Sequence, residues 1–214
     1  NELFKRLLSS IILLPIAFFF IIKGSLVFIF FISLCFLITS YEWHMMSKKK
    51  DYYFFGFIFL ILSFYTVYKL IDFGGNYVYF LMITLICVST DIGGYIFGKI
   101  FKGPKLTNIS PKKTYSGMIG GYILSIISII IFFHFLYLFQ NSSEITTDIF
   151  IFVFLVSTVS QIGDITISYF KRLSKIKNTG KIIPGHGGLL DRIDGMIFAF
   201  PFSYLILSIN IFKY

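Results

Sequence analysis

Long apolar runs constrain the fold of this chain more than any other feature. Seven of them alternate with short polar stretches, at residues 7–22, 26–42, 53–71, 77–98, 116–139, 148–167 and 195–212. Of all residues, 57% are hydrophobic and 14% are charged, whereas about a quarter of an ordinary soluble domain is charged. A helix needs about 20 apolar residues to cross a bilayer, so the sequence predicts an all-α fold, a polytopic membrane helical bundle of about seven transmembrane segments.

The basic residues predict the orientation of this bundle. With seven crossings, the N-terminus and the loops 43–52, 99–115 and 168–194 share one side, which holds every Lys and Arg except Lys23, Lys69 and Lys213. By the positive-inside rule this side is cytoplasmic. The net charge of +9 raises the question of nucleic-acid binding, but no basic and aromatic module supports it, so no nucleic acid is expected. Anionic lipid or nucleotide phosphates are the better partners.

The first apolar run has one feature of a signal peptide, because Lys5-Arg6 precede it. No small-residue cleavage site follows it, and the next run begins almost at once. We therefore expect a retained helix. The connection Lys23-Gly24-Ser25 is so short that the first two runs form either two crossings or a hairpin.

Two carboxylates occur where hydrocarbon is expected. Asp91 ends a mostly apolar run that begins at Phe80, and Asp164 ends another that begins at Phe150. An ionisable group in a spanning helix is costly unless it is paired or hydrated, so both are candidates for function. The alternative is that each carboxylate only marks the cytoplasmic end of its helix. Asp191 follows in the same cytoplasmic stretch as Asp164 and could share a ligand with it.

The loop before residue 116 has features of a phosphate site. Ser110 and Pro111 suit the N-cap and the first position of a helix. A helix N-terminus with adjacent lysines, here Lys112 and Lys113, attracts phosphate. The alternative is a basic loop that binds anionic lipid, which explains the lysines but not the three glycines that follow.

A glycine-rich turn near the C-terminal end has the composition of an anion site. Gly185, Gly187 and Gly188 can present backbone N–H groups to an anion, and His186 and Arg192 can act as further donors. The spacing does not match a Walker loop, because Lys-Ser/Thr is missing after the second glycine. The alternative is a turn that only leads into a helix.

The carboxylates after this turn suggest a cation. Asp191 and Asp194 are three residues apart, so they share one face of a helical turn. Mg²⁺ is usually held by one or two carboxylates together with substrate phosphates. No nucleophile with a partnered base is visible, so metal-assisted attack on phosphorus is the expected chemistry. The alternative is that these carboxylates are simply solvated.

Two blocks of sequence resemble a known family. Ser168-Tyr-Phe-Lys171-Arg172, with Pro184-Gly-His-Gly-Gly188-Leu-Leu-Asp191-Arg192-Ile-Asp194, resembles the signature of the phosphatidate cytidylyltransferases, the CDP-diacylglycerol synthases. The block from Asp91-Ile-Gly-Gly-Tyr95 to Ser110-Pro-Lys-Lys-Thr114 and Gly121 is similar to the same family. The chain departs from the family at Asn178, where Asp is usual, and at Ser116, where Glu is common.

The resemblance implies that CTP and phosphatidate give CDP-diacylglycerol and pyrophosphate for phospholipid biosynthesis, by metal-assisted attack of the lipid phosphate on the α-phosphorus of CTP. Carried over by position, the catalytic residues are Asp164, Lys171, Arg172, His186, Asp191, Arg192 and Asp194. The substrate-binding residues are Asp91, Ser110, Lys112, Lys113, Thr114, Ser168, Gly185, Gly187 and Gly188. Asp164 and Asp191 are expected to bind Mg²⁺ or another divalent cation, and a second cation stays open.

The same resemblance implies an organisation and a location. Residues 1–75 are expected to form N-terminal membrane helices, and residues 76–214 the catalytic membrane domain with the nucleotide and phosphatidate site. The expected location is the inner (plasma) membrane of a bacterium, with catalytic loops that face the cytoplasm. CTP, phosphatidate and membrane lipid are the expected partners, and a homodimer stays open.

Three other functions fit the sequence less well. An ion- or proton-coupled transporter would use the intramembrane Asp91 and Asp164, but symmetric broken-helix halves are not visible and the polar groups lie in cytoplasmic loops. A CTP-dependent polyprenol kinase shares some of the architecture but matches the Gly-His-Gly-Gly run less well. A CDP-alcohol phosphotransferase would need an Asp-Gly-x₂-Ala-Arg motif, which is absent from the sequence.

Overall fold

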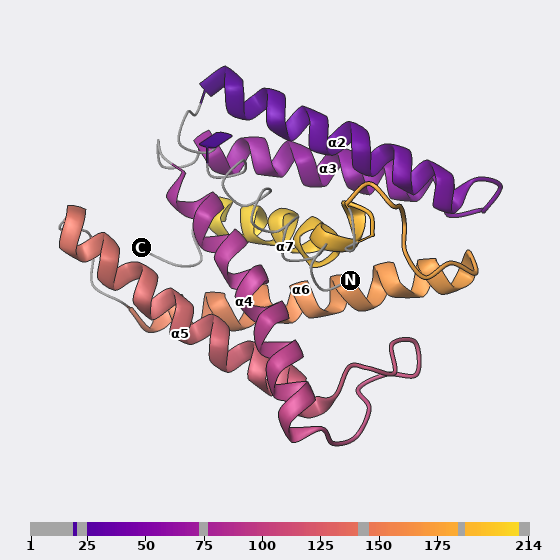
Figure 1. Cartoon of the computed structure of the whole chain (residues 1–214). Coiled ribbons are helices and arrows are strands. Elements are labelled where there is room, and N and C mark those ends of the chain that lie inside the picture. Colours follow the sequence, from indigo (N-terminus) through magenta and orange to yellow (C-terminus); the bar gives the residue numbers. More distant parts are fainter. Residues whose placement is uncertain (1–18, 21–24, 73–76, 141–145, 184–186, 210–214) are drawn as a thin grey trace. The chain divides into compact units, whose positions relative to one another are not determined.

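The computed structural model describes residues 19–20, 25–72, 77–140, 146–183 and 187–209 (Figure 1). Within these residues the chain forms helices and no strands, which confirms the predicted all-α fold. The six helices that can be given bounds are α2 (Ser25–Ser47), α3 (Tyr53–Asp72), α4 (Val78–Phe101), α5 (Tyr115–Gln140), α6 (Thr147–Leu173) and α7 (Leu190–Ser208).

Five of these helices, α2 to α6, are long and apolar enough to cross a membrane. The protein is therefore an integral membrane protein. Helix α7 has 19 residues, but its first turns carry Asp191, Arg192 and Asp194, which shortens its apolar part. The predicted first segment, 7–22, lies almost wholly outside the described residues. A total of seven spans thus stays a prediction.

The structure corrects the bounds of three predicted segments. Helix α2 continues to Ser47 rather than ending at 42. Helix α6 continues to Leu173 rather than ending at 167, and α7 begins at Leu190 rather than at 195. The apolar pattern stops where side chains become polar, but backbone hydrogen bonding continues beyond that point because it does not depend on apolar side chains. Lys171 and Asp191, which were expected in a cytoplasmic loop, therefore lie on helices.

The chain divides into two compact units. The first takes Asn1–Tyr68 and Tyr169–Asp194, and the second takes Lys69–Ser168 and Gly195–Tyr214. In the first unit α2 and α3 run alongside each other (Figure 1). Trp43, which is 2% exposed, joins them because its Nε1 donates to the carbonyl of Tyr53 at 3.0 Å.

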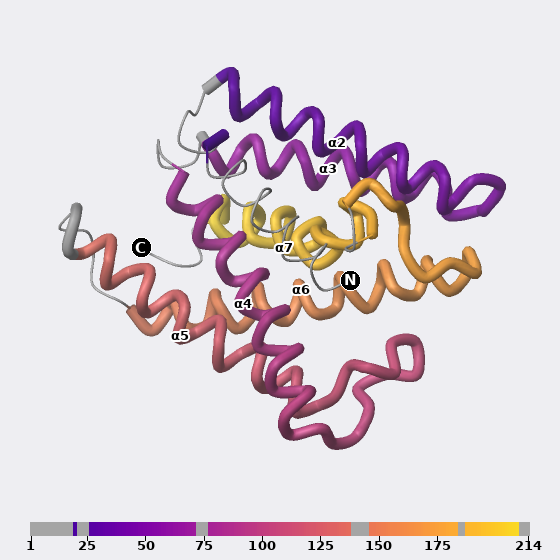
Figure 2. Tube along the Cα trace, in the orientation of Figure 1, coloured from indigo at the N-terminus to yellow at the C-terminus, as the bar shows by residue number. Residues whose placement is uncertain are grey.

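In the second unit α4 and α5 cross closely near the loop that joins them (Figure 2). A Cβ built on Gly117 would lie 2.7 Å from the carbonyl oxygen of Gly94 and 3.4 Å from the Cα of Gly98. The four-residue spacing of Gly94 and Gly98 predicts such an approach, and the structure confirms it. Gly94, Gly98 and Gly117 therefore allow the two helices to pack closely. This packing accounts for glycines that a phosphate site or a lipid-binding loop would not require.

The start of α5 differs from the prediction. Ser110 and Pro111 lie in a turn, and the helix begins at Tyr115. Thr114 caps it instead, because its Oγ1 accepts the N–H of Gly117 at 3.1 Å, the geometry of an N-cap to its third helical residue. The loop pairs with itself between Lys105 and Thr114, which delays the helix.

Candidate active site

Each unit holds one group of the polar residues predicted from the sequence. In the first unit the centre is Lys171, whose side chain is only 10% exposed. Its Nζ lies 2.9 Å from Asp191 Oδ1 and 3.8 Å from Asp194 Oδ2. Two carboxylates thus surround one buried ammonium group. An unpaired buried charge is strongly unfavourable, so each of these three side chains depends on the others.

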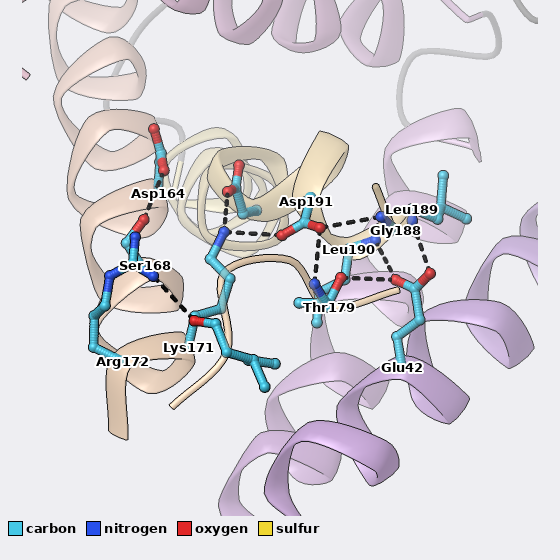
Figure 3. A network of polar contacts seen from close by, with 12 residues as sticks. Glu42, Asp164, Ser168, Lys171, Arg172, Thr179, Gly188, Leu189, Leu190 and Asp191 are labelled. Carbon is cyan, nitrogen blue, oxygen red and sulfur yellow. Dashed lines mark hydrogen bonds and ion pairs between the residues drawn. The ribbon is translucent and has the colours of Figure 1, made fainter. Parts of the chain in front are cut away.

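Asp191 uses both of its carboxylate oxygens. Oδ1 accepts from Lys171, and Oδ2 accepts the backbone N–H groups of Thr179 at 2.9 Å and Gly188 at 3.1 Å (Figure 3). A carboxylate in the first turn of a helix, where Asp191 lies in α7, also favours that helix, since the N-terminus carries positive partial charge. Asp191 therefore ties α6, the linker and the glycine-rich turn together.

The described part of the glycine-rich turn donates its N–H groups within the chain. The N–H of Gly187 bonds to the carbonyl of Ile183 at 3.1 Å, and that of Gly188 bonds to Asp191. Gly187 has a φ of 93°, a backbone conformation that residues other than glycine rarely adopt. The predicted presentation of these two N–H groups to an anion is not the arrangement seen here, and a role of the turn in phosphate binding stays a prediction.

Glu42 completes this group and was not predicted. It lies near the end of α2, is 1% exposed, and accepts three hydrogen bonds (Figure 3). These come from the N–H of Leu189 at 2.9 Å, the N–H of Leu190 at 2.7 Å and Oγ1 of Thr179 at 3.1 Å. The one signal in the sequence was a lone carboxylate at the boundary of an apolar run.

In the second unit the α4–α5 loop meets α6. Nζ of Lys113 lies 2.5 Å from Asp164 Oδ2, with the two side chains 23% and 26% exposed. On the other side of the carboxylate, Oγ of Ser168 lies 3.4 Å from Asp164 Oδ1. The sequence placed both blocks on one side of the membrane, and the pair shows that the loop and α6 approach each other here.

Most of the other predicted residues are more exposed to solvent. Arg172 is exposed and donates from Nη1 to the carbonyl of Ile176 at 3.0 Å. Arg192, Lys112 and Asp91 are also exposed. Ser110 stays at the base of its turn, where its carbonyl accepts the N–H of Lys113 at 3.0 Å. Two predicted residues, Gly185 and His186, lie outside the described residues.

A divalent cation fits Asp164 better than Asp191. Over the ranges that the structure describes, three or more His, Cys, Asp or Glu side chains do not gather into a metal-binding group. Mg²⁺ needs only one or two carboxylates when substrate phosphates complete its shell. The Asp164 carboxylate is partly exposed; Lys113 occupies its Oδ2, but Oδ1 has only one weak hydrogen bond and can meet an ion. Both oxygens of Asp191 already accept hydrogen bonds. An ion could bind Asp191 only by replacing the ammonium group of Lys171 or by binding beside it.

Comparison with known proteins gives the family. A family model described as the cytidylyltransferase family matches residues 52–210. The chain belongs to the cytidylyltransferase family. It is accordingly an enzyme, a nucleotidyltransferase, as the two blocks of sequence predicted.

Several curated members of the family are similar over most of their length. A protein from Rickettsia typhi named phosphatidate cytidylyltransferase is 34% identical over 220 residues, which cover 99% of this chain and 93% of that protein. A protein of the same name from Rickettsia bellii is 35% identical, with 96% and 91% covered. One from Staphylococcus saprophyticus is 33% identical over 184 residues, with 82% and 67% covered.

The family match and the geometry differ in one respect. The matched residues, 52–210, include both blocks that were recognised in the sequence. Glu42 precedes them, yet its carboxylate accepts from Thr179, 137 residues further along the chain. The polar group of the first unit therefore includes Glu42, which lies outside the residues that the family model matches.

Proposed function

We propose that the protein is a CTP:phosphatidate cytidylyltransferase, which makes CDP-diacylglycerol and pyrophosphate for phospholipid biosynthesis. The observation that carries this proposal is the similarity, over 99% of the chain, to a protein named for that activity. The two ion-pair groups support it, because charged residues gathered in an apolar helical protein suit a substrate rich in phosphate.

In the proposed reaction, a phosphate oxygen of phosphatidate attacks the α-phosphorus of CTP. The new P–O bond forms as the bond to the β-phosphate breaks, and pyrophosphate leaves with the electron pair of that bond. Phosphoryl and nucleotidyl transfer depend chiefly on positioning and on stabilisation of charge. Lys113, Arg172 and Arg192 supply positive charge from partly or fully exposed side chains, so they are the proposed phosphate contacts.

Mg²⁺ is proposed as the cofactor, with Asp164 and Asp191 as its protein ligands. When bound with substrate phosphates, such an ion neutralises charge on the reacting phosphates. The buried ammonium group of Lys171, which lies between Asp191 and Asp194, then acts within the protein rather than on the phosphates. It holds the carboxylates of Asp191 and Asp194 in place.

The proposed location is the inner membrane of a bacterium, with both polar groups at the cytoplasmic side. The support is the charge distribution, since the segments 99–115 and 168–194 hold most of the Lys and Arg residues. Nucleotides are cytoplasmic, so this orientation gives the enzyme access to CTP.

The test uses the full chain purified in detergent, with CTP, Mg²⁺ and phosphatidate. We expect release of pyrophosphate that depends on the lipid, and its loss in Asp164→Asn. Asp148→Asn is the matched control, because Asp148 lies in the first turn of the same helix, α6, far from the signature. Release of CDP without pyrophosphate would instead indicate a CTP-dependent kinase, and no lipid-dependent turnover would disprove the proposal.

A further inference from the structure

The carboxylate of Glu42 sits at the start of another helix. Leu189 precedes α7, and its carbonyl accepts the N–H groups of Arg192 at 2.9 Å and Ile193 at 3.2 Å, as an N-cap residue does. A leucine side chain cannot cap, so the first N–H groups of α7 need another acceptor. Glu42 provides it from α2, 148 residues earlier than Leu190.

Two glycines make room for this carboxylate. A Cβ built on Gly180 would lie 2.6 Å from Glu42 Oε1, and a Cβ built on Gly188 would lie 2.6 Å from both Glu42 oxygens. Any side chain at these positions would have to displace the carboxylate, since the contacts are far below van der Waals distance. The linker and the glycine-rich turn are thus shaped around Glu42.

The hydrogen bonds connect Glu42 with Asp191. Thr179 takes part on both sides, because its hydroxyl donates to Glu42 and its N–H donates to Asp191 (Figure 3). Leu190, whose N–H donates to Glu42, directly precedes Asp191. Loss of the Glu42 carboxylate would leave buried N–H groups without an acceptor. The free-energy penalty for each such group is at least as large as the net contribution of an ordinary hydrogen bond. The position of Asp191 would change with them.

We infer that Glu42 is a positioning residue for the reaction: through Thr179 and the start of α7 it holds the glycine-rich turn and Asp191 in their working arrangement. Glu42 itself touches neither reacting phosphate in this account. The inference rests on the proposed function for the reaction that is measured, but the effect on the turn can be measured without it.

The test compares three variants of the full chain in detergent. Glu42→Gln keeps the shape of the side chain but turns one acceptor into a donor that faces the N–H groups of α7. Thr179→Val removes only the hydroxyl that donates to Glu42. Thr39→Val is the control, because Thr39 is also fully buried on α2, but its hydroxyl donates to carbonyls of its own helix.

Two quantities are measured: backbone hydrogen exchange of residues 176–192 by mass spectrometry, and kcat and KM for CTP with phosphatidate. In Glu42→Gln we expect exchange at the start of α7 to become about tenfold faster, and kcat/KM for CTP to fall by about tenfold or more, with a higher KM. A smaller folded fraction would lower kcat without raising KM, so the rise in KM identifies positioning. Thr39→Val should change neither quantity by more than about twofold.

The double variant adds a second criterion. Because Glu42 and Thr179 belong to one network, the effect of both substitutions together should be smaller than the product of their separate effects. Unchanged exchange and an unchanged KM in an active Glu42→Gln variant would overturn the inference. If Glu42→Gln does not fold, Thr179→Val decides by the same two quantities. If the wild type shows no lipid-dependent turnover, the proposed function fails, and hydrogen exchange alone decides whether Glu42 holds the turn.

Discussion

Nζ of Lys171 lies 2.9 Å from Oδ1 of Asp191, although 20 residues separate them in the sequence, and both side chains are nearly buried. The pair joins the end of α6 to the start of α7. The basic residue that follows in the same run, Arg172, is exposed. Two adjacent residues of one helix thus differ in their surroundings: Lys171 balances charge inside the protein, whereas Arg172 lies at the surface.

The first prediction concerns Lys171→Met. Removal of the ammonium group leaves two buried carboxylates without their cation, so we expect a loss of about 3–5 kcal/mol in the free energy of unfolding. Unfolding can be followed in detergent by the fluorescence of Trp43, the single tryptophan, which is 2% exposed in the same unit. Lys177→Met, at an exposed position of the linker that follows α6, should change stability little. Equal stability of the two variants would contradict the prediction.

The second prediction concerns the pair of Lys113 and Asp164. The two groups are in contact, so Lys113→Gln and Asp164→Asn should not be independent in the lipid-dependent reaction. In a double-mutant cycle on kcat/KM we expect a coupling energy of about 0.5–3 kcal/mol. Lys105→Gln, on the same loop but exposed, should show no coupling with Asp164→Asn. Additive effects of Lys113→Gln and Asp164→Asn would mean that the contact has no role in catalysis.

The third prediction concerns the crossing of α4 and α5. A methyl group at Gly117 would lie 2.7 Å from the carbonyl of Gly94, whereas one at Gly94 meets nothing closer than 3.7 Å. Gly117→Ala should therefore destabilise the protein by about 1–3 kcal/mol. Gly94→Ala should be neutral or slightly stabilising, because Ala favours a helix over Gly by about 1 kcal/mol. Thermal unfolding in detergent checks this, and the reverse order of the two variants would contradict the packing.

The fourth prediction concerns the cap of α5. Thr114→Ala removes the oxygen that accepts the N–H of Gly117 and should cost about 1 kcal/mol of stability. Thr114→Ser keeps the oxygen and should restore most of it. Ser110→Ala should cost less than Thr114→Ala, because Ser110 lies in the preceding turn. A larger effect at Ser110 would favour the N-cap that the local sequence pattern suggested.

Much of the fold follows from local patterns. Apolar runs of sufficient length predict spanning helices whatever their neighbours are, and the described part of the chain contains five such helices. The ends of α2 and α6 and the start of α7 were predicted wrongly, because hydropathy reports where apolar side chains stop, while a helix ends where backbone hydrogen bonding stops. The charge pattern also predicted that the loop before α5 and the end of α6 share one side, which the contact of Lys113 with Asp164 supports.

The sequence alone determined the class of fold, the family and the stretches that carry the polar residues, because these depend on composition and on residues close together in the chain. Only the tertiary structure decided what those residues contact. Asp191 meets Lys171 and two backbone N–H groups, and Glu42 accepts from residues 137 to 148 positions away. Hydrogen bonds over such separations depend on how helices pack, and packing has no local signal in the sequence.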